Sequence, residues 1–139
     1  MDDLVIYQKL TSLKRCVDRI RDKIPEESKE LQYNYDLQDI ISVNLQRAVQ
    51  LCVDIGARII ARLDLNPPLT MAETFECLKE SGVLSPHTCM RMKKSVGFRN
   101  IAVHEYHAIN WDIVYSISTH DLKDFQAFAA EIVAWLENN

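Results

Sequence analysis

The segment Asp36–Leu63, with the sequence DLQDIISVNLQRAVQLCVDIGARIIARL, decides the fold of this chain. Its apolar residues recur in steps of four and three along one side of a helix: Leu37, Ile41, Leu45, Ala48, Cys52, Ile55 and Ile59. This pattern predicts one long helix that buries one face. Gly56 costs a helix interior roughly 1 kcal/mol relative to alanine, so we interpret it as a place where another helix approaches closely.

The segments on either side also have helical patterns. An apolar stripe precedes the central segment: Ile6, Leu10, Leu13, Val17, Ile20 and Ile24. Pro25 and the polar run after it end this first helix. Beyond the central segment, Asn66-Pro67-Pro68 forces a break.

Three further helix starts follow the break. Thr70 and Glu73 form a capping box that opens a short helix ending at Gly82, and Ser85-Pro86 starts a fourth helix. Asn110 caps a last helix with the stripe Val114, Ile117, Phe125, Phe128, Ile132 and Trp135. The sequence has no strand pattern and no repeat. It therefore predicts an all-α bundle of five helices, two of them long, in one domain over residues 1–139.

The composition is that of an ordinary soluble globular protein, with 47% hydrophobic and 26% charged residues among 139. No apolar run approaches the roughly 20 residues that a membrane span needs, and the start Met1-Asp2-Asp3 is acidic where a signal peptide is basic. We expect a cytoplasmic protein without membrane contact. The cysteines are far apart and are expected to be reduced, buried residues: Cys16, Cys52, Cys77 and Cys89.

The net charge of −4 is unevenly distributed. No acidic residue occurs from Ser81 to His104, a stretch that contains the basic residues Arg91, Lys93, Lys94 and Arg99. A second basic stretch lies near the N-terminus: Lys9, Lys14, Arg15, Arg19, Arg21 and Lys23, opposed by Asp18 and Asp22. Local fields attract phosphate more than the total charge does. The N-terminal stretch fits a solvated helix face equally well.

The residues with the most chemistry follow each other at the end of the fourth helix, in Arg99-Asn100-Ile101-Ala102-Val103-His104-Glu105-Tyr106. Asn100 and His104 are one helical turn apart, and Arg99 and Tyr106 share a column if the helix continues. The long side chain of Arg99 can turn toward the imidazole. The four groups are therefore expected to form one concave patch.

This set of side chains suits cleavage of an RNA phosphodiester. A histidine has a pKa suited to proton transfer near neutral pH, and an arginine stabilises charge that develops on phosphate. RNA supplies its own nucleophile, the 2′-OH, so no metal or cofactor is needed. A dimer that joins two such helix ends would supply both a base and an acid. The simpler reading is a structural histidine at a helix C-terminus, where its positive form suits the dipole.

The segment from Gly97 to Tyr106 resembles the motif of HEPN-domain ribonuclease toxins, and in particular of the HepT subgroup. That motif is an arginine followed by a polar residue, then a histidine, then a tyrosine two residues further on. Other stretches across the chain have the look of the same subgroup: Lys14-Arg15-Cys16, Leu37-Gln38-Asp39, Asn44-Leu45-Gln46-Arg47 and Leu122-Lys123-Asp124-Phe125. The resemblance covers nearly the whole chain and implies a HEPN-type homodimer.

The resemblance also implies a role for each motif residue. Arg99 and His104 would be the catalytic pair of a metal-independent endoribonuclease toxin that cuts tRNA or mRNA. Asn100 would position the substrate or the histidine. Tyr106 would receive AMP from a cognate minimal nucleotidyltransferase antitoxin and become O-AMP-tyrosine, which excludes RNA by charge and bulk. The alternative is a non-catalytic HEPN-type subunit that binds substrate for a nucleotidyltransferase, and a purely structural bundle is the third class.

Several other residues are weaker candidates. The side chains expected to contact RNA are Arg91, Lys93, Lys94 and His107. A zinc site from His104 and His107 with a nearby histidine or cysteine fits no standard spacing, so no metal is expected. Asp39 and Arg47 either brace the motif, line the cleft or form a solvated ion pair. Asp121 occupies a stripe position, where it could pair across an interface. Trp111 and Trp135 are expected to fill the core or an interface.

Overall fold

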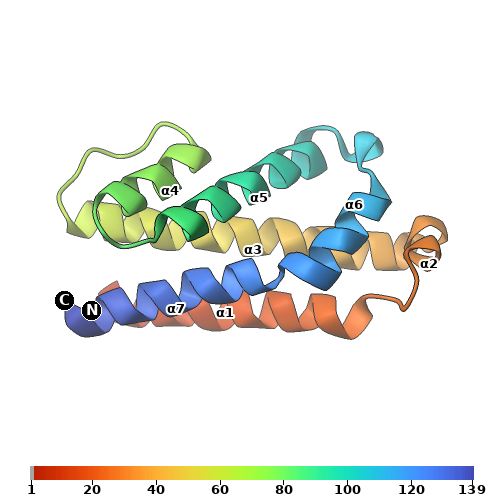
Figure 1. The fold of residues 1–139 in the computed structure, drawn as a ribbon, viewed down its shortest axis with the longest axis horizontal. Helices are drawn as coiled ribbons and strands as arrows, with labels where there is room; N and C mark the ends of the chain where they lie inside the picture. Colours follow the sequence, from red (N-terminus) through yellow and green to blue (C-terminus); the bar gives the residue numbers. More distant parts are fainter. Residues whose placement is uncertain (1) are drawn as a thin grey trace.

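The computed structural model describes residues 2–139, and this range contains helices and turns but no strand (Figure 1). The elements are α1 (Asp2–Lys23), α2 (Ser28–Tyr33), α3 (Tyr35–Arg62), α4 (Met71–Glu80), α5 (Pro86–His104), a 3-10 turn (Tyr106–Ala108), α6 (Trp111–Ser116), a π-helical turn (Ile117–Asp121) and α7 (Lys123–Asn138). The all-α prediction is confirmed. No helix in this range is both long and apolar enough to cross a bilayer.

Helix α3 lies at the centre of the bundle, packed against α1 on one side and against α4 and α5 on the other (Figure 1). Six of its seven predicted stripe residues are buried: Ile41, Leu45, Ala48, Cys52, Ile55 and Ile59. Leu37 is partly buried. The stripe of α1 supplies Ile6, Leu13, Val17 and Ile20 to the same core. The periodicity of two segments thus placed the central packing correctly.

The contact between α3 and α4 explains the glycine inside α3. A Cβ atom on Gly56 would lie 2.6 Å from Thr74 Cγ2 and 3.0 Å from Leu78 Cδ1. Thr74 and Leu78 are both buried. The close helix approach predicted at Gly56 is therefore present, and only a residue without a side chain permits it.

The predicted helix starts carry the expected caps. The Thr70 hydroxyl accepts a hydrogen bond from the Glu73 amide at 3.1 Å, and the Ser85 hydroxyl accepts one from the Thr88 amide at 3.2 Å. The capping box differs in one detail, because the Glu73 carboxylate accepts from the amide of Leu69 and not from that of Thr70. These local bonds satisfy amides that helix starts leave free.

Two parts of the fold differ from the prediction. The polar run after Pro25 contains a short helix, α2, which buries Leu31 completely. The predicted last helix is divided by the π-helical turn Ile117–Asp121 into α6 and α7. The inserted turn shifts the register of the stripe, so Asp121 forms an ion pair with Arg91 of the same chain. Within the chain the partner of Asp121 is thus Arg91, and the pairing suggested for Asp121 across an interface stays a prediction.

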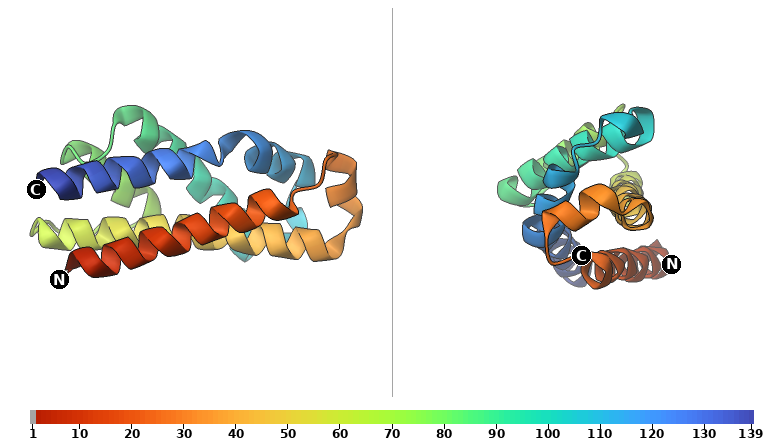
Figure 2. Two further views of the ribbon diagram at one scale, coloured as in Figure 1. Left: turned by 90° about the horizontal axis from the view of Figure 1, so that it is seen from below. Right: turned by 90° about the vertical axis from the view of Figure 1, so that its right-hand side faces the viewer.

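The view along the helices shows their order around one side of the bundle (Figure 2). On that face α3 lies between α1 and α5, and α1 and α3 run side by side along most of their length. The C-terminal end of α5 and the 3-10 turn border the same face (Figure 2). The chemistry-bearing motif therefore lies next to the outer surface of α3.

Candidate active site

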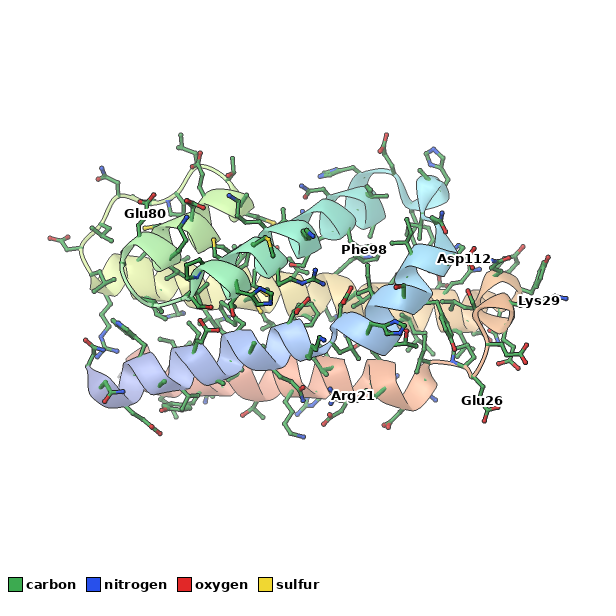
Figure 3. All side chains as sticks on the ribbon, in the orientation of Figure 1. Arg21, Glu26, Lys29, Glu80, Phe98 and Asp112 are labelled. Atoms are coloured by element: carbon green, nitrogen blue, oxygen red, sulfur yellow. The ribbon has the colours of Figure 1, made fainter. Side chains whose placement is uncertain are left out.

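The C-terminal half of α5 positions the motif residues. The helix ends at His104, where the amide of Glu105 still donates to the carbonyl of Ile101 at 2.8 Å. Buried Ala102 faces the core, so Asn100 and His104 are exposed and Arg99 is partly buried. Figure 3 labels the neighbouring Phe98 on the part of α5 that leads into the motif. Since α5 ends here, Tyr106 does not continue its column and belongs to the 3-10 turn instead.

The guanidinium group of Arg99 is oriented by two neutral amides. Its Nη2 atom donates to the Gln50 Oε1 atom of α3 at 3.3 Å, and its Nη1 atom donates to the Asn100 Oδ1 atom at 3.4 Å. Gln50 is itself held by a 2.9 Å bond from its Nε2 atom to Asp54 Oδ1. Amide oxygens carry no net charge, so they fix the direction of the arginine without cancelling its charge.

Gln50 is the site residue that the sequence did not reveal. It lies 49 positions before Arg99 in the chain, and no local pattern distinguishes it from the other glutamines of its helix. Asn100, in contrast, was predicted as the polar motif residue that positions the substrate or the histidine, and that role stays a prediction. In the structure its side chain accepts the hydrogen bond from Arg99 described above.

Tyr106 is anchored to α3 by a single strong hydrogen bond. Its hydroxyl donates to Asp39 Oδ1 at 2.6 Å, and its ring packs edge-on against Trp111 with the centroids 5.8 Å apart. Burial, and then the Asp39 carboxylate, raise the pKa of the phenol above its usual value. About 40% of Tyr106 is nevertheless exposed. Asp39 therefore contacts the motif through Tyr106, which fits the bracing role among the three alternatives given for it, and Trp111 is partly buried beside Tyr106.

In the folded chain, basic residues of the stretch from Ser81 to His104, which has no acidic residue, form ion pairs with carboxylates from other parts of the fold. Arg91 Nη2 lies 3.0 Å from Asp121 Oδ1, and Arg91 Nε lies 2.9 Å from Asp124 Oδ2. Lys93 Nζ lies 3.1 Å from Glu76 Oε2. Two of the four residues expected to contact RNA thus have compensated charges, while Lys94 and His107 are exposed. The linear distribution of charge overstated the positive field here.

Glu76 is the centre of this local network. Lys79 and Lys93 bind its carboxylate at 2.7 and 3.1 Å and lower its pKa to about 2. Cys89 also directs its thiol toward the same carboxylate, at 3.6 Å, and is buried. All four cysteines are free, and three of them are buried as predicted. In residues 2–139, no three histidine, cysteine or acidic side chains come together in a way that could hold a metal ion.

Apolar side chains are exposed beside the motif. Val43 lies one turn after Asp39 on α3 and is 39% exposed, and Val103 lies one turn after Arg99 on α5 and is 45% exposed. Together with Tyr106 they border the polar groups on an open surface. The motif therefore lies on an open surface with polar and apolar groups side by side.

Comparison with known proteins gives consistent matches over nearly the whole chain. Residues 13–132 match the family described as Ribonuclease HepT-like. The chain is 34% identical over 134 residues to the mRNA nuclease HepT of Shewanella oneidensis, which spans 96% of this chain and 99% of that protein. It is 24% identical over 136 residues to the tRNA nuclease HepT of Aphanizomenon flos-aquae, with 98% and 92% of the two chains covered.

A solved structure matches the fold equally well. It is the tri-AMPylated Shewanella oneidensis HEPN toxin in complex with MNT antitoxin, with a TM-score of 0.87 and 34% sequence identity. The match covers 94% of this chain and 97% of that toxin chain. The fold and the sequence thus point to the same group of proteins.

Proposed function

Because this chain belongs to the HepT-like ribonuclease family, we propose that it is the toxin of a toxin–antitoxin pair and cleaves RNA with Arg99 and His104. One observation carries the proposal. Arg99 is held in a fixed direction by the amide oxygens of Gln50 and Asn100, which leave its positive charge available, and His104 is exposed five residues further along the same helix end. A structural arginine is more often matched with a carboxylate, as Arg91 is here.

The reaction follows from the groups present. One imidazole removes the proton of the ribose 2′-OH, the 2′ oxygen attacks the adjacent phosphorus, and the bond to the 5′ oxygen breaks. A second imidazole gives a proton to the departing 5′ oxygen. The products are a 2′,3′-cyclic phosphate and a 5′-hydroxyl. Arg99 stabilises the extra negative charge on the phosphoryl oxygens in the transition state, and no step requires a metal ion.

The need for two imidazoles leads to a homodimer. One chain contributes one histidine to the motif, so a second copy must supply His104 of the second subunit as the other proton-transfer group. Exposed Val43 and Val103 beside the polar groups support an interface at this face, because covering them removes apolar surface from water. Such an interface would also enclose the phosphate, which a single subunit leaves open.

Regulation by a nucleotidyltransferase antitoxin is the second part of the proposal. A HEPN toxin with 34% identity to this chain is known in an AMPylated form with MNT antitoxin. Tyr106 is the residue that fits this modification, since about 40% of it is exposed and it lies close to Arg99 and His104 in the sequence. The phenolic oxygen would attack the α-phosphorus of ATP, pyrophosphate would leave, and Asp39 would accept the proton it already binds.

AMP on Tyr106 would inactivate the site by electrostatics and bulk. Each AMP group adds a negative charge close to the arginine that is meant to receive the substrate phosphate. The added nucleotide would therefore occupy the place of the RNA. It would also separate Tyr106 from Asp39, since the modified oxygen has no proton left to donate.

Measurements of RNA cleavage test the nuclease part of the proposal. The chain, His104→Ala and Arg99→Ala are purified and incubated with tRNA and with mRNA in the presence of EDTA, and the cleaved ends are analysed. We expect cyclic phosphate ends from the unmodified chain and a loss of about 10²–10⁴-fold in rate for either variant. Equal rates for all three proteins, or a complete loss of activity in EDTA, would contradict the proposed chemistry.

Mass spectrometry tests the regulation separately. Coexpression with a cognate minimal nucleotidyltransferase should add whole adenylyl units to the chain, located at Tyr106 and absent from Tyr106→Phe. The alternative, a non-catalytic subunit that binds substrate for the nucleotidyltransferase, predicts partner binding without any RNA cleavage.

A further inference from the structure

A groove lined by arginines runs between α1 and α3, next to the motif. Its volume is about 460 Å³. Arg15 and Arg19 of α1 line one wall, and Arg47 and Gln50 of α3 line the other. Gln50 is the residue whose Oε1 atom accepts the hydrogen bond from Arg99. The groove therefore extends to the side chain that orients the candidate catalytic arginine.

Helix geometry brings the three arginines to one place. Arg15 and Arg19 are four residues apart on α1, so they are about 6 Å apart along the axis and project from nearly the same face. Arg47 precedes Gln50 by three residues on α3, about 4.5 Å along the axis. Cys16 also lines the groove: burial raises the pKa of its thiol, and the charges of Arg47 and Arg15 oppose that rise in part.

The positive charge of the groove is not cancelled locally. The ion pairs found in residues 2–139 involve other arginines, namely Arg21, Arg62 and Arg91, and none involves the three that line the groove. Asp54 is the carboxylate in the lining, and it is bound by Gln50 and faces Lys9 at 4.0 Å. All three groove arginines are exposed to solvent. An open groove with three such guanidinium groups is suited to a chain of anions.

We propose that this groove binds the phosphates of the RNA strand on one side of the cleaved bond and leads the strand to Arg99. The inference rests on the ribonuclease function proposed above. Successive phosphates of a single strand have a spacing comparable to one helical turn, so two or three of them can meet Arg19, Arg15 and Arg47 in order. Arg99 then receives the phosphate at which cleavage occurs.

An RNA strand fits this groove better than an acidic protein segment does. Three of the polar lining residues are Arg15, Arg19 and Arg47, whose guanidinium groups bind phosphate without selecting bases. The carboxylate in the lining, Asp54, already accepts a hydrogen bond from Gln50. The groove is also continuous with the site where a phosphate has to bind for the reaction. Binding of an acidic protein segment in the groove would not require any of its groups to reach Arg99.

The experiment measures RNA binding in the full-length chain with His104→Ala, which prevents cleavage during the measurement. Arg15→Gln, Arg19→Gln and Arg47→Gln are introduced singly and together, and Kd for a single-stranded RNA oligonucleotide is determined at several salt concentrations. We expect the triple variant to bind about 10–100-fold more weakly. Each phosphate contact contributes about 0.7 to the slope of log K against log salt, so the slope should fall by about 2.

Arg58→Gln is the matched control, since Arg58 is exposed on the same helix, outside the groove lining and about 16 Å from Arg47 along the axis. It removes the same charge and should change Kd by less than about twofold. If Arg58→Gln weakened RNA binding as much as Arg47→Gln does, the proposed role of the groove would be wrong, because RNA would then respond only to the overall charge of the protein.

Kinetics with the natural His104 separate this inference from the proposed function. In the triple variant KM should rise while kcat stays within about twofold, because no group that touches the reacting atoms is changed. An unchanged KM and Kd in the triple variant would overturn the groove while leaving Arg99 and His104 as the catalytic pair. Loss of nucleotidyltransferase binding with unchanged RNA binding would assign the groove to the protein partner and also overturn the inference.

Discussion

Replacing Gly56 with alanine places a methyl group where α3 and α4 touch. The new Cβ would lie 2.6 Å from Thr74 Cγ2 and 3.0 Å from Leu78 Cδ1, and the two neighbours are 2% and 0% exposed. Neither can move into solvent, so the helices must separate. Overpacking of this kind costs typically about 1–3 kcal/mol, against a gain in helix propensity of about 1 kcal/mol. Because the nearer contact is 2.6 Å and both neighbours are buried, the cost should lie in the upper part of its range, and we expect Gly56→Ala to lower the free energy of unfolding by about 1–2 kcal/mol.

Gly97 offers the opposite result from the same substitution. It lies inside α5, and no atom lies within 4 Å of the position that its Cβ would take. Gly97→Ala therefore gains helix propensity without a clash and should stabilise the chain by about 0.5–1 kcal/mol. The free energies of unfolding of the two variants should differ by about 1.5–3 kcal/mol. Their melting temperatures should therefore differ by roughly 5–15 °C, since 1 kcal/mol corresponds to about 3–5 °C in a domain of this size.

Thermal unfolding followed by far-ultraviolet circular dichroism measures both variants, at one protein concentration because subunit association adds to the apparent stability. Thr74→Ser removes the methyl group that Gly56→Ala meets, so the double variant should lose less stability than the two single changes added together. Strict additivity, or a Gly56→Ala protein as stable as Gly97→Ala, would refute the close-contact explanation.

Three shorter predictions concern charges around the site. Asp39→Asn should lower the pKa of Tyr106, because the carboxylate that raises it is gone; an absorbance titration of the phenolate, corrected with Tyr106→Phe, measures this, and an unchanged pKa would contradict it. Glu76→Gln should destabilise the chain at neutral pH. The difference from the natural chain should shrink as the pH falls from about 4.5 toward 2, because the pKa of Glu76 is lowered to about 2 and the stability it provides is lost on protonation. Urea denaturation at a series of pH values measures this difference, and a difference that stays constant with pH would contradict the prediction. Arg91→Ala should reduce stability but leave KM for RNA nearly unchanged, since two carboxylates already bind this arginine, whereas Lys94→Ala should raise KM.

The elements that the sequence predicted well are those whose cause is local. The stripes of α1 and α3 follow from helical periodicity, and the caps at Thr70 and Ser85 need only residues three positions away. Helix α2 was missed because six mostly polar residues contain a single buried side chain, Leu31. The π-helical turn was missed because a stripe of apolar residues does not reveal one extra residue in a turn.

The candidate site shows the same division. The motif residues are close in sequence, namely Arg99, Asn100, His104 and Tyr106. Their chemistry and the resemblance to one ribonuclease family could therefore be recognised from the sequence alone. Their partners were not, because Gln50 and Asp39 lie 49 and 67 positions away. Of the distant residues, Asp39 and Arg47 were suspected only in general terms.

By itself, the amino-acid order determined the main helical segments, the residues that carry the chemistry and the family resemblance, because helical periodicity, capping and the motif all depend on residues a few positions apart. Only the tertiary structure decided which of the many charges remain available. Folding brings Glu76, Asp121 and Asp124 onto a stretch with no acid of its own, while Arg99 meets two amides and the α1–α3 groove keeps its arginines uncancelled. Electrostatic energy depends on distance in space and not on separation along the chain.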